Sequence, residues 1–140
     1  MNILIAADYI ARNSGNFVAL LVELSELLRK KNHQVYCVFP RQEEPFPWAG
    51  WLEKATGHPV YYFTGEEEST PNAVQKLIVR HRIDMIHTHF GYLRRMLIRQ
   101  PKAFKNVRVL IHDHMGFSTN KATIKERCKY AAVSIRFRMS

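Results

Sequence analysis

Residues 3–7, Ile3-Leu4-Ile5-Ala6-Ala7, form a short apolar run without polar alternation near the start of the sequence. Such a run is typical of a strand that is covered on both faces, as strands of a parallel sheet are. Four later segments have the length and composition of strands, and each is separated from the next by polar or amphipathic sequence. The five predicted strands are Ile3–Ala7, Gln34–Phe39, Val60–Phe63, Ile83–His89 and Val107–His112.

The segments between these strands predict helices. The first helix follows the turn at residues 13–16 and carries an apolar stripe. It ends in Arg29-Lys30-Lys31, whose positive charges suit the C-terminal end of the helix dipole. The stripe consists of Phe17, Leu20, Leu21, Leu24, Leu27 and Leu28. Another helix is predicted after Pro71, and its inner face consists of Ala73, Val74, Leu77, Ile78 and His81. The remaining helices are predicted at Trp48–Ala55, Tyr92–Arg99 and Lys121 to about Arg138.

Strands that alternate with helices are parallel neighbours, because a parallel connection requires a crossover, and such crossovers are right-handed. We therefore predict an α/β fold with a doubly wound, Rossmann-like parallel sheet and helices on both faces. The 140 residues accommodate one such domain. The longest apolar run, Phe17–Val22, is too short for a membrane span, and the first residues lack a basic signal-peptide region. Cys37 and Cys128 form no disulfide or zinc pattern, and we interpret Cys37 as a buried small apolar residue.

Charge is distributed unevenly along the sequence. Residues 1–91 contain nine Lys and Arg against ten Asp and Glu, whereas residues 92–140 contain twelve against two. A surface with this much positive charge attracts phosphate groups, whether these belong to nucleic acid, anionic lipid or a sugar diphosphate. The alternative is a solvated face that only keeps the protein soluble.

Ligands of doubly wound sheets bind beyond the carboxyl ends of the strands, where the strand order reverses. After the first predicted strand comes the Asn13–Asn16 turn. There Gly15 either closes the turn or, with Ser14 and Asn16, presents backbone amides to a phosphate. The fourth strand ends in His87-Thr88-His89, in which we interpret His87 as a core residue and His89 as exposed to the cleft. His112, at the end of the fifth strand, is either an acid–base or ligand-binding residue or an anchor for the following loop.

Four segments in this order resemble the N-terminal domain of GT-B glycosyltransferases, specifically the large retaining family numbered four. They are Asn2–Ile5 leading into the Gly15 loop, Leu27–Val35, Asp84–His89 and Val109–Asp113. The sequence departs from the family in having the single Gly15 where a glycine pair is usual, and Asn32 where glycine is usual. The second Rossmann domain of such enzymes, which holds most of the nucleotide pocket, is missing. We therefore expect residues 1–140 to be one truncated N-terminal domain, inactive without its C-terminal half.

The resemblance implies transfer of a sugar, with retention, from a nucleotide-diphosphate sugar to a hydroxyl of a glycan or lipid-linked acceptor, without a metal or other cofactor. It implies that the amides of Ser14, Gly15 and Asn16 face the donor diphosphate. His112 is then the catalytic residue near the donor sugar. The residues that border the acceptor are His89, Phe90, Gly91 and Asp113.

Enzymes of this kind often work on cell-envelope acceptors, and the basic half of the sequence predicts contact with anionic lipid. The contact residues are Arg94, Arg95, Arg99, Lys102 and Lys105. Phe46, Trp48 and Trp51 are predicted to dip into the interface. The location we expect is cytoplasmic, and a peripheral position at the inner face of the membrane stays open, as does self-association.

Two other functions compete with sugar transfer. One is a metal-dependent hydrolase, because His87, His89, His112 and His114 have the spacing of ligands on adjacent strands. The scarcity of carboxylates near those strands, Asp113 apart, argues against it. The other is a binding module for a polyanionic glycan or nucleic acid, although no motif for specific nucleic-acid recognition is present.

Overall fold

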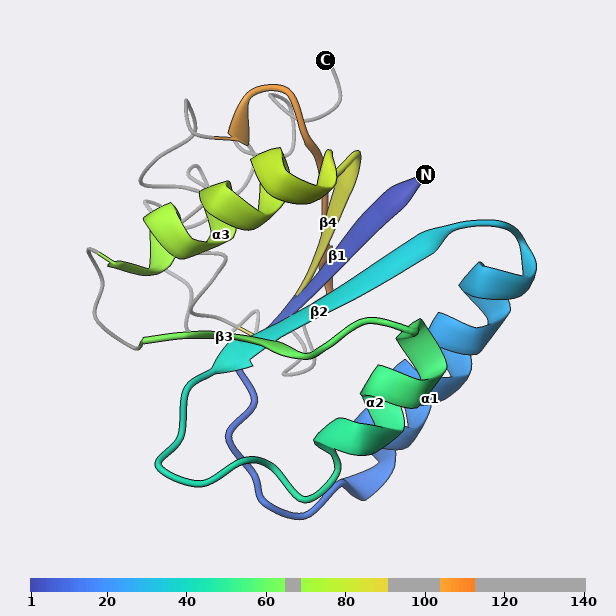
Figure 1. Ribbon diagram of the computed structural model, residues 1–140, viewed down its shortest axis with the longest axis vertical. Coiled ribbons are helices and arrows are strands. Elements are labelled where there is room, and N and C mark those ends of the chain that lie inside the picture. Colours follow the sequence, from blue (N-terminus) through green and yellow to red (C-terminus); the bar gives the residue numbers. More distant parts are fainter. Residues whose placement is uncertain (65–68, 91–103, 113–140) are drawn as a thin grey trace, which may run out of the picture.

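The structure is a computed structural model that describes residues 1–64, 69–90 and 104–112, except the side chains of residues 69–71 (Figure 1). Its strands are β1 (Asn2–Ala7), β2 (Gln34–Pro40), β3 (Tyr61–Phe63), β4 (Met85–His89) and β5 (Arg108–His112). Its helices are α1 (Gly15–Lys30), α2 (Ala49–Thr56) and α3 (Ser69–His81). The two helices predicted at Tyr92–Arg99 and from Lys121 lie outside the described residues.

The five strands form one parallel sheet in the order β3-β2-β1-β4-β5. From β1 the chain moves outward to β2 and β3, then returns to the other side of β1 for β4 and β5. Strand order therefore reverses between β1 and β4, which makes this boundary the topological switch point of the sheet. The prediction of a doubly wound parallel α/β fold is confirmed.

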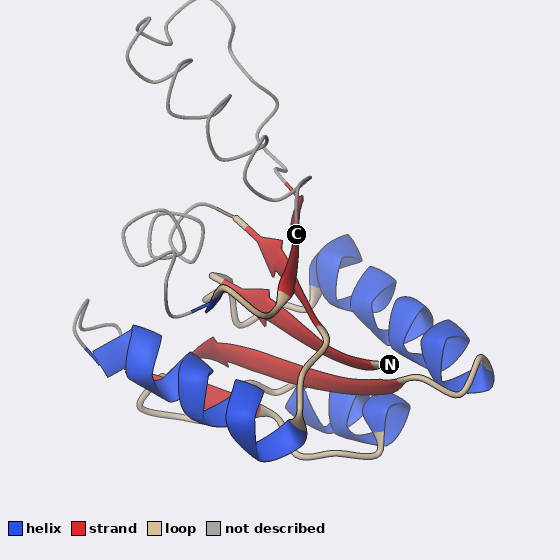
Figure 2. Cartoon of the chain, turned by 90° about the horizontal axis from the view of Figure 1, so that it is seen from above, coloured by secondary structure: helices blue, strands red, loops and turns tan. Residues whose placement is uncertain are grey.

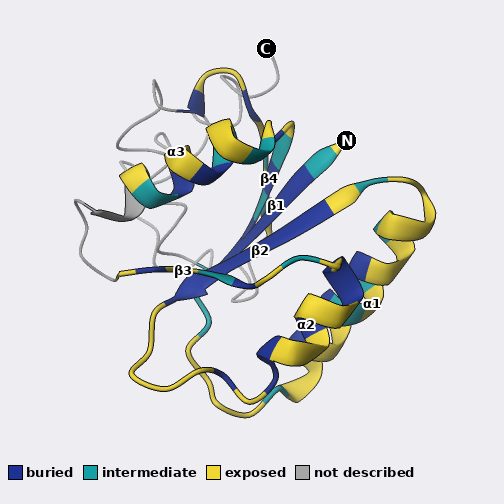
Figure 3. Cartoon of the chain, in the orientation of Figure 1, coloured by how far each residue is buried: buried dark blue, intermediate teal, exposed yellow. Residues whose placement is uncertain are grey.

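Helices cover both faces of the sheet. Helices α1 and α2 pack on one face and α3 on the other (Figures 1 and 2). The α1/α2 side buries Ile5 and Cys37, whereas the α3 side buries their neighbours Leu4 and Val38. Strands β1 and β2 are buried along most of their length (Figure 3), as their unbroken apolar sequence predicts.

The buried stripe of α1 is shifted from the predicted one. Val18, Leu21 and Ser25 face the sheet, but Leu20 and Leu27 are 47% and 57% exposed. The prediction was wrong there because a run of leucines fits more than one helical stripe. Ser25 is accommodated because its hydroxyl donates a hydrogen bond to the carbonyl of Leu21 at 2.7 Å.

Helix α1 ends in a Schellman motif. The N–H of His33 donates to the carbonyl of Leu28 at 3.0 Å, and the N–H of Asn32 donates to the carbonyl of Arg29 at 2.9 Å. The motif requires a left-handed residue at Asn32, whose φ is +59°. Asparagine tolerates this conformation better than most residues, so it takes the place of the glycine that the resemblance led us to expect.

Candidate functional site

The carboxyl ends of β1, β4 and β5 lie level with one another at the switch point. Ala7 pairs with His89, and His89 pairs with His112 across the next strand boundary. Directly beyond these pairs, the N–H of Asp8 donates to the carbonyl of His89 at 3.3 Å. The predicted ends of three strands, widely separated in sequence, therefore form one edge.

Tyr9 sets the conformation of the loop between β1 and α1. Its hydroxyl donates to the carbonyl of Asn13 at 2.9 Å and lies 3.4 Å from the carbonyl oxygen of Ser14. Gly15 then begins α1 with a φ of +52°, a left-handed conformation that favours glycine. Sequence reasoning missed Tyr9, although its place directly after a strand end was a usable signal.

The first turn of α1 begins in exposed residues. Gly15 and Asn16 are exposed, and Ser14 makes no side-chain capping bond to the helix. The first turn also contains no acidic residue, so the positive end of the helix dipole is not neutralised by its own helix. The assignment of Ser14, Gly15 and Asn16 to a donor diphosphate is compatible with this geometry and stays a prediction.

An aromatic cluster adjoins this loop. The ring centroids of Tyr9 and Phe17 are 4.8 Å apart, those of Phe17 and Phe90 are 5.0 Å apart, and Tyr9 stacks on Phe90 at 5.9 Å. Phe90 has a φ of +69°, which is rare for a bulky residue. This conformation turns the chain immediately after β4 and lays the Phe90 ring beside residues from the β1–α1 region.

His89 lies beneath this cluster and is only 1% exposed. The edge of its ring meets Phe17, with the centroids 5.2 Å apart. The prediction that His89 is exposed and His87 buried was wrong, because His87 is half-buried while the first turn of α1 and the Phe90 turn cover the end of β4. The assignment of His89 to the acceptor stays a prediction.

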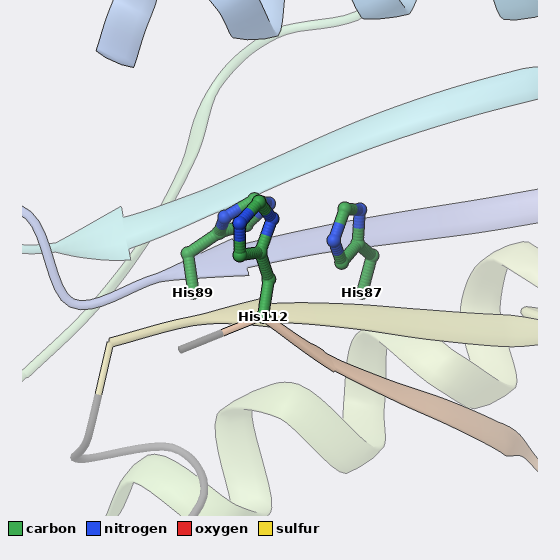
Figure 4. A group of neighbouring side chains, drawn as sticks. All are labelled: His87, His89 and His112. Carbon is green, nitrogen blue, oxygen red and sulfur yellow. The ribbon is translucent and has the colours of Figure 1, made fainter. Parts of the chain in front are cut away.

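Three imidazoles gather on one face of β4 and β5 (Figure 4). His87 and His89 alternate along β4, and His112 stands opposite His89 on β5, so the three share the face that α1 and α2 cover elsewhere. One ring nitrogen from each lies within 4.8 Å of the corresponding atom of the others. Ring centroids of His87 and His89 are 4.1 Å apart, and those of His89 and His112 are 5.1 Å apart. The convergence predicted for four histidines is confirmed for these three, and the fourth, His114, lies outside the described residues.

The exposure of the three histidines forms a gradient. His89 is buried, His87 is half-buried and His112 is exposed. On β5, Leu110 lies beside His87, and its side chain is 49% exposed. The group is therefore closed toward β1 and open toward β5 within the part of the chain that the structure describes.

Perturbed pKa values occur away from this edge. Burial raises the pKa of Cys37 to about 12, so this thiol is not a nucleophile at neutral pH. Burial, with a smaller contribution from the Arg29 charge, lowers the pKa of His58. Burial, followed by the charges of Arg80 and His58, lowers the pKa of His81. Both histidines stack on Tyr36, at centroid distances of 4.3 and 4.2 Å.

The residues predicted to touch a membrane have different outcomes. Lys105 is exposed in the turn before β5. Phe46 and Trp48 are 3% and 1% exposed, so the prediction that they enter a lipid interface was wrong: both pack in the core under α2. Trp51 is 56% exposed. Several predicted site residues fall outside the described ranges, namely Gly91, Arg94, Arg95, Arg99, Lys102, Asp113 and His114.

Trp48 has a structural role instead. Its indole N–H donates to the carbonyl of Ala11 at 3.0 Å, which fixes the β1–α1 loop to the segment before α2. A hollow of about 430 Å³ lies near this junction, between the β1–α1 and β2–α2 loops. It is lined by Arg12, Arg41, Gln42, Glu43, Glu44 and Phe46. Because Arg12 is paired with Glu44 at 2.7 Å, the hollow offers an anion less positive charge than its two arginines suggest.

None of the described helices is both long and apolar enough to cross a membrane.

Comparison with known proteins identifies the fold and nothing finer. No protein-family model matches the sequence, and no curated protein does. Among solved structures, the C-terminal domain of a hydrogenase from Pyrococcus furiosus is similar, with 15% identity and a TM-score of 0.52 over 81% of this chain and 90% of that one. At that identity the likeness shows the fold alone.

A UDP-glucose-4-epimerase from Stenotrophomonas maltophila, solved with NAD and formylated UDP-arabinopyranose, is similar at 13% identity. The match covers 98% of this chain and 34% of the epimerase. Its TM-score of 0.40 is too low to carry an argument about ligands.

Proposed function

We propose that the chain is the acceptor-side domain of a GT-B glycosyltransferase that moves a sugar from a nucleotide-diphosphate donor to a hydroxyl acceptor, with retention. One observation carries the proposal. Three of the four segments that resemble the family end at the same edge of the sheet, where the Gly15 turn, His89 and His112 flank the switch point. Ligands of open α/β sheets bind in this crevice.

The roles follow from exposure and charge. The backbone amides of Gly15 and Asn16, two exposed residues at the start of α1, receive the diphosphate, on which negative charge grows as the glycosidic bond breaks. The exposed imidazole of His112 is within reach of a ligand and contacts the donor sugar. His89 is buried, so in this proposal it borders the acceptor only through the Phe90 turn that covers it.

A donor-binding measurement tests the proposal without requiring catalysis, which in a GT-B enzyme needs a second domain. The nitrogen-15 labelled chain is titrated with UDP-glucose, GDP-mannose and ADP-glucose while backbone amide shifts are followed. We expect at least one donor to bind with a dissociation constant on the order of millimolar, because a single wall supplies few contacts. The largest shifts should fall on Gly15, Asn16 and His112.

Two controls test whether the donor binds at this edge of the sheet. Glucose without a diphosphate should leave the Gly15 and Asn16 amides unshifted. The His112→Ala variant should weaken donor binding, whereas His33→Ala, at the opposite edge of the sheet, should not. The proposal is overturned if no donor shifts residues 14–16, or if the shifts gather on the α3 face.

We further propose that the acceptor is a cell-envelope or lipid-linked glycan and that the basic residues from Arg94 to Lys105 face anionic lipid. Support comes from the concentration of basic residues after residue 91 and from the exposure of Lys105. Co-sedimentation with vesicles tests this surface: binding should require anionic lipid and weaken with salt. Equal binding to neutral vesicles would contradict it.

A further inference from the structure

The three imidazoles of His87, His89 and His112 need an explanation that sugar transfer does not supply, since the proposed reaction gives a direct ligand contact only to His112 and no role to His87. The strands fix their arrangement. Hydrogen-bonded register sets His89 opposite His112, and the two-residue repeat of β4 sets His87 on the same face. Three nitrogen ligands are thus presented from two adjacent strands rather than from mobile loops.

We propose that His87, His89 and His112 together bind one divalent transition-metal ion, for which Zn²⁺ is the probe. Imidazole nitrogen is a preferred ligand for Zn²⁺, Cu²⁺ and Ni²⁺, whereas Mg²⁺ and Ca²⁺ prefer oxygen. Three histidines with one position left open are a donor set that catalytic zinc sites use. The proposal goes beyond sugar transfer and does not rest on it.

The distances between the three ring nitrogens fit a tetrahedral zinc site after a small movement of the side chains. A zinc–nitrogen bond of about 2.0–2.1 Å in tetrahedral geometry places two ligand nitrogens about 3.4 Å apart. The three nitrogens lie within 4.8 Å of one another, so closure requires at most about 1.4 Å of approach between any two. Rotation of the exposed His112 side chain can shorten its distances to the other two nitrogens, and the half-buried His87 can move toward His89 while His89 stays in the core.

The burial gradient indicates where the open position lies. His89 is closed in by Phe17, whereas His112 and Leu110 are exposed on β5. A metal held by the three rings is therefore reached by solvent from the β5 side. An oxygen ligand such as water, a hydroxyl or a phosphate would complete its coordination from there.

Metal titration of the whole 140-residue chain tests the proposal. The protein is prepared without a histidine tag and stripped with EDTA. Co²⁺ is added while the visible absorption of its coordination sphere is recorded, and Zn²⁺ is added in competition. We expect one metal per chain, an absorption spectrum of nitrogen-coordinated Co²⁺, and displacement of Co²⁺ by Zn²⁺ but not by Mg²⁺.

Variants assign the ligands. Loss of an outer-shell partner weakens metal binding about 10- to 100-fold, so loss of a direct ligand in His87→Ala or His112→Ala should cost at least about tenfold. His33→Ala is the matched control, since His33 lies at the opposite edge of the sheet near the N-terminus, and it should bind as the parent does. His112 is exposed, so His112→Ala keeps the fold even if His87→Ala does not.

The outcomes are decisive in both directions. The proposal is overturned if Zn²⁺ does not bind at one equivalent, or if His112→Ala binds it as tightly as the His33→Ala control. The proposed sugar transfer can fail separately, because donor binding is followed by amide shifts and can be repeated on protein stripped of metal with EDTA. If both proposals hold, Zn²⁺ should suppress the donor-induced shift at His112 and leave that at Gly15.

Discussion

Two glycines in the same molecule should respond to alanine with opposite sign. Gly15 has a φ of +52°, and a Cβ added there would meet the Tyr9 hydroxyl at 3.5 Å, an ordinary contact. The cost of Gly15→Ala is therefore conformational, about 1–2 kcal/mol for a left-handed L-residue. Gly50 is the second residue of α2, and a Cβ there would meet nothing within 4 Å. Gly50→Ala should stabilise the fold by about 0.5 kcal/mol, because glycine loses more backbone entropy in a helix than alanine does.

Urea unfolding followed by tryptophan fluorescence measures both changes, since Trp48 is buried and becomes solvated on unfolding. With a denaturant slope of about 2 kcal/mol per molar, Gly15→Ala should lower the midpoint by about 0.5–1 M and Gly50→Ala should raise it by less. If Gly15→Ala is neutral or stabilising, the left-handed start of α1 is not required by the fold. A destabilising Gly50→Ala would instead contradict the open space around that residue.

Three further predictions concern the rest of the sheet. Asn32→Ala should destabilise the protein by about 1 kcal/mol and Asn32→Gly should not, because the Schellman motif holds position 32 in a left-handed conformation; thermal unfolding of both variants checks this. The pKa values of His58 and His81 are lowered from 6.5, so the unfolded chain takes up protons that the folded chain resists, and stability should fall as the pH drops below about 6.5. A double glutamine variant of these histidines should flatten that pH dependence in urea titrations, and an unchanged slope would refute the assignment. Native protein at pH 8 should resist alkylation at Cys37, whose thiol is buried and has a pKa raised to about 12, whereas urea-unfolded protein should react fully; peptide mass spectrometry distinguishes the two.

The sheet was predictable because its signal is local. The unbroken apolar run at residues 3–7 indicated a strand buried on both faces, and the alternation of strands with helices implied parallel pairing. Helix faces were less predictable. Leu20 and Leu27 fit the periodicity of α1 but lie on its exposed side, since packing against β1, β2 and α2 decides which of two overlapping leucine stripes is covered.

The location of the site was predictable from the sequence, but the burial of its residues was not. The rule that ligands gather at carboxyl strand ends selected His89, His112 and the Gly15 turn. Burial of His89 could not be predicted from β4 alone, because the ring that packs against it, Phe17, belongs to α1. Trp48 was misjudged for a related reason: its indole donates to the carbonyl of Ala11, a contact with a segment distant in the sequence.

The two proposals draw on opposite sides of the switch point. The Gly15 turn belongs to the β1–α1 connection, whereas the three imidazoles belong to β4 and β5. The two sides meet at Phe17, which follows the Gly15 turn on α1 and contacts His89 with its ring. A ligand that used only the turn would resemble a simple anion bound at a helix N-terminus, and one that used only the histidines would be a metal ion. A nucleotide sugar differs from both because it needs its diphosphate at one side and its sugar at the other, so coupling between Gly15 and His112 is the property that separates sugar transfer from two independent small sites.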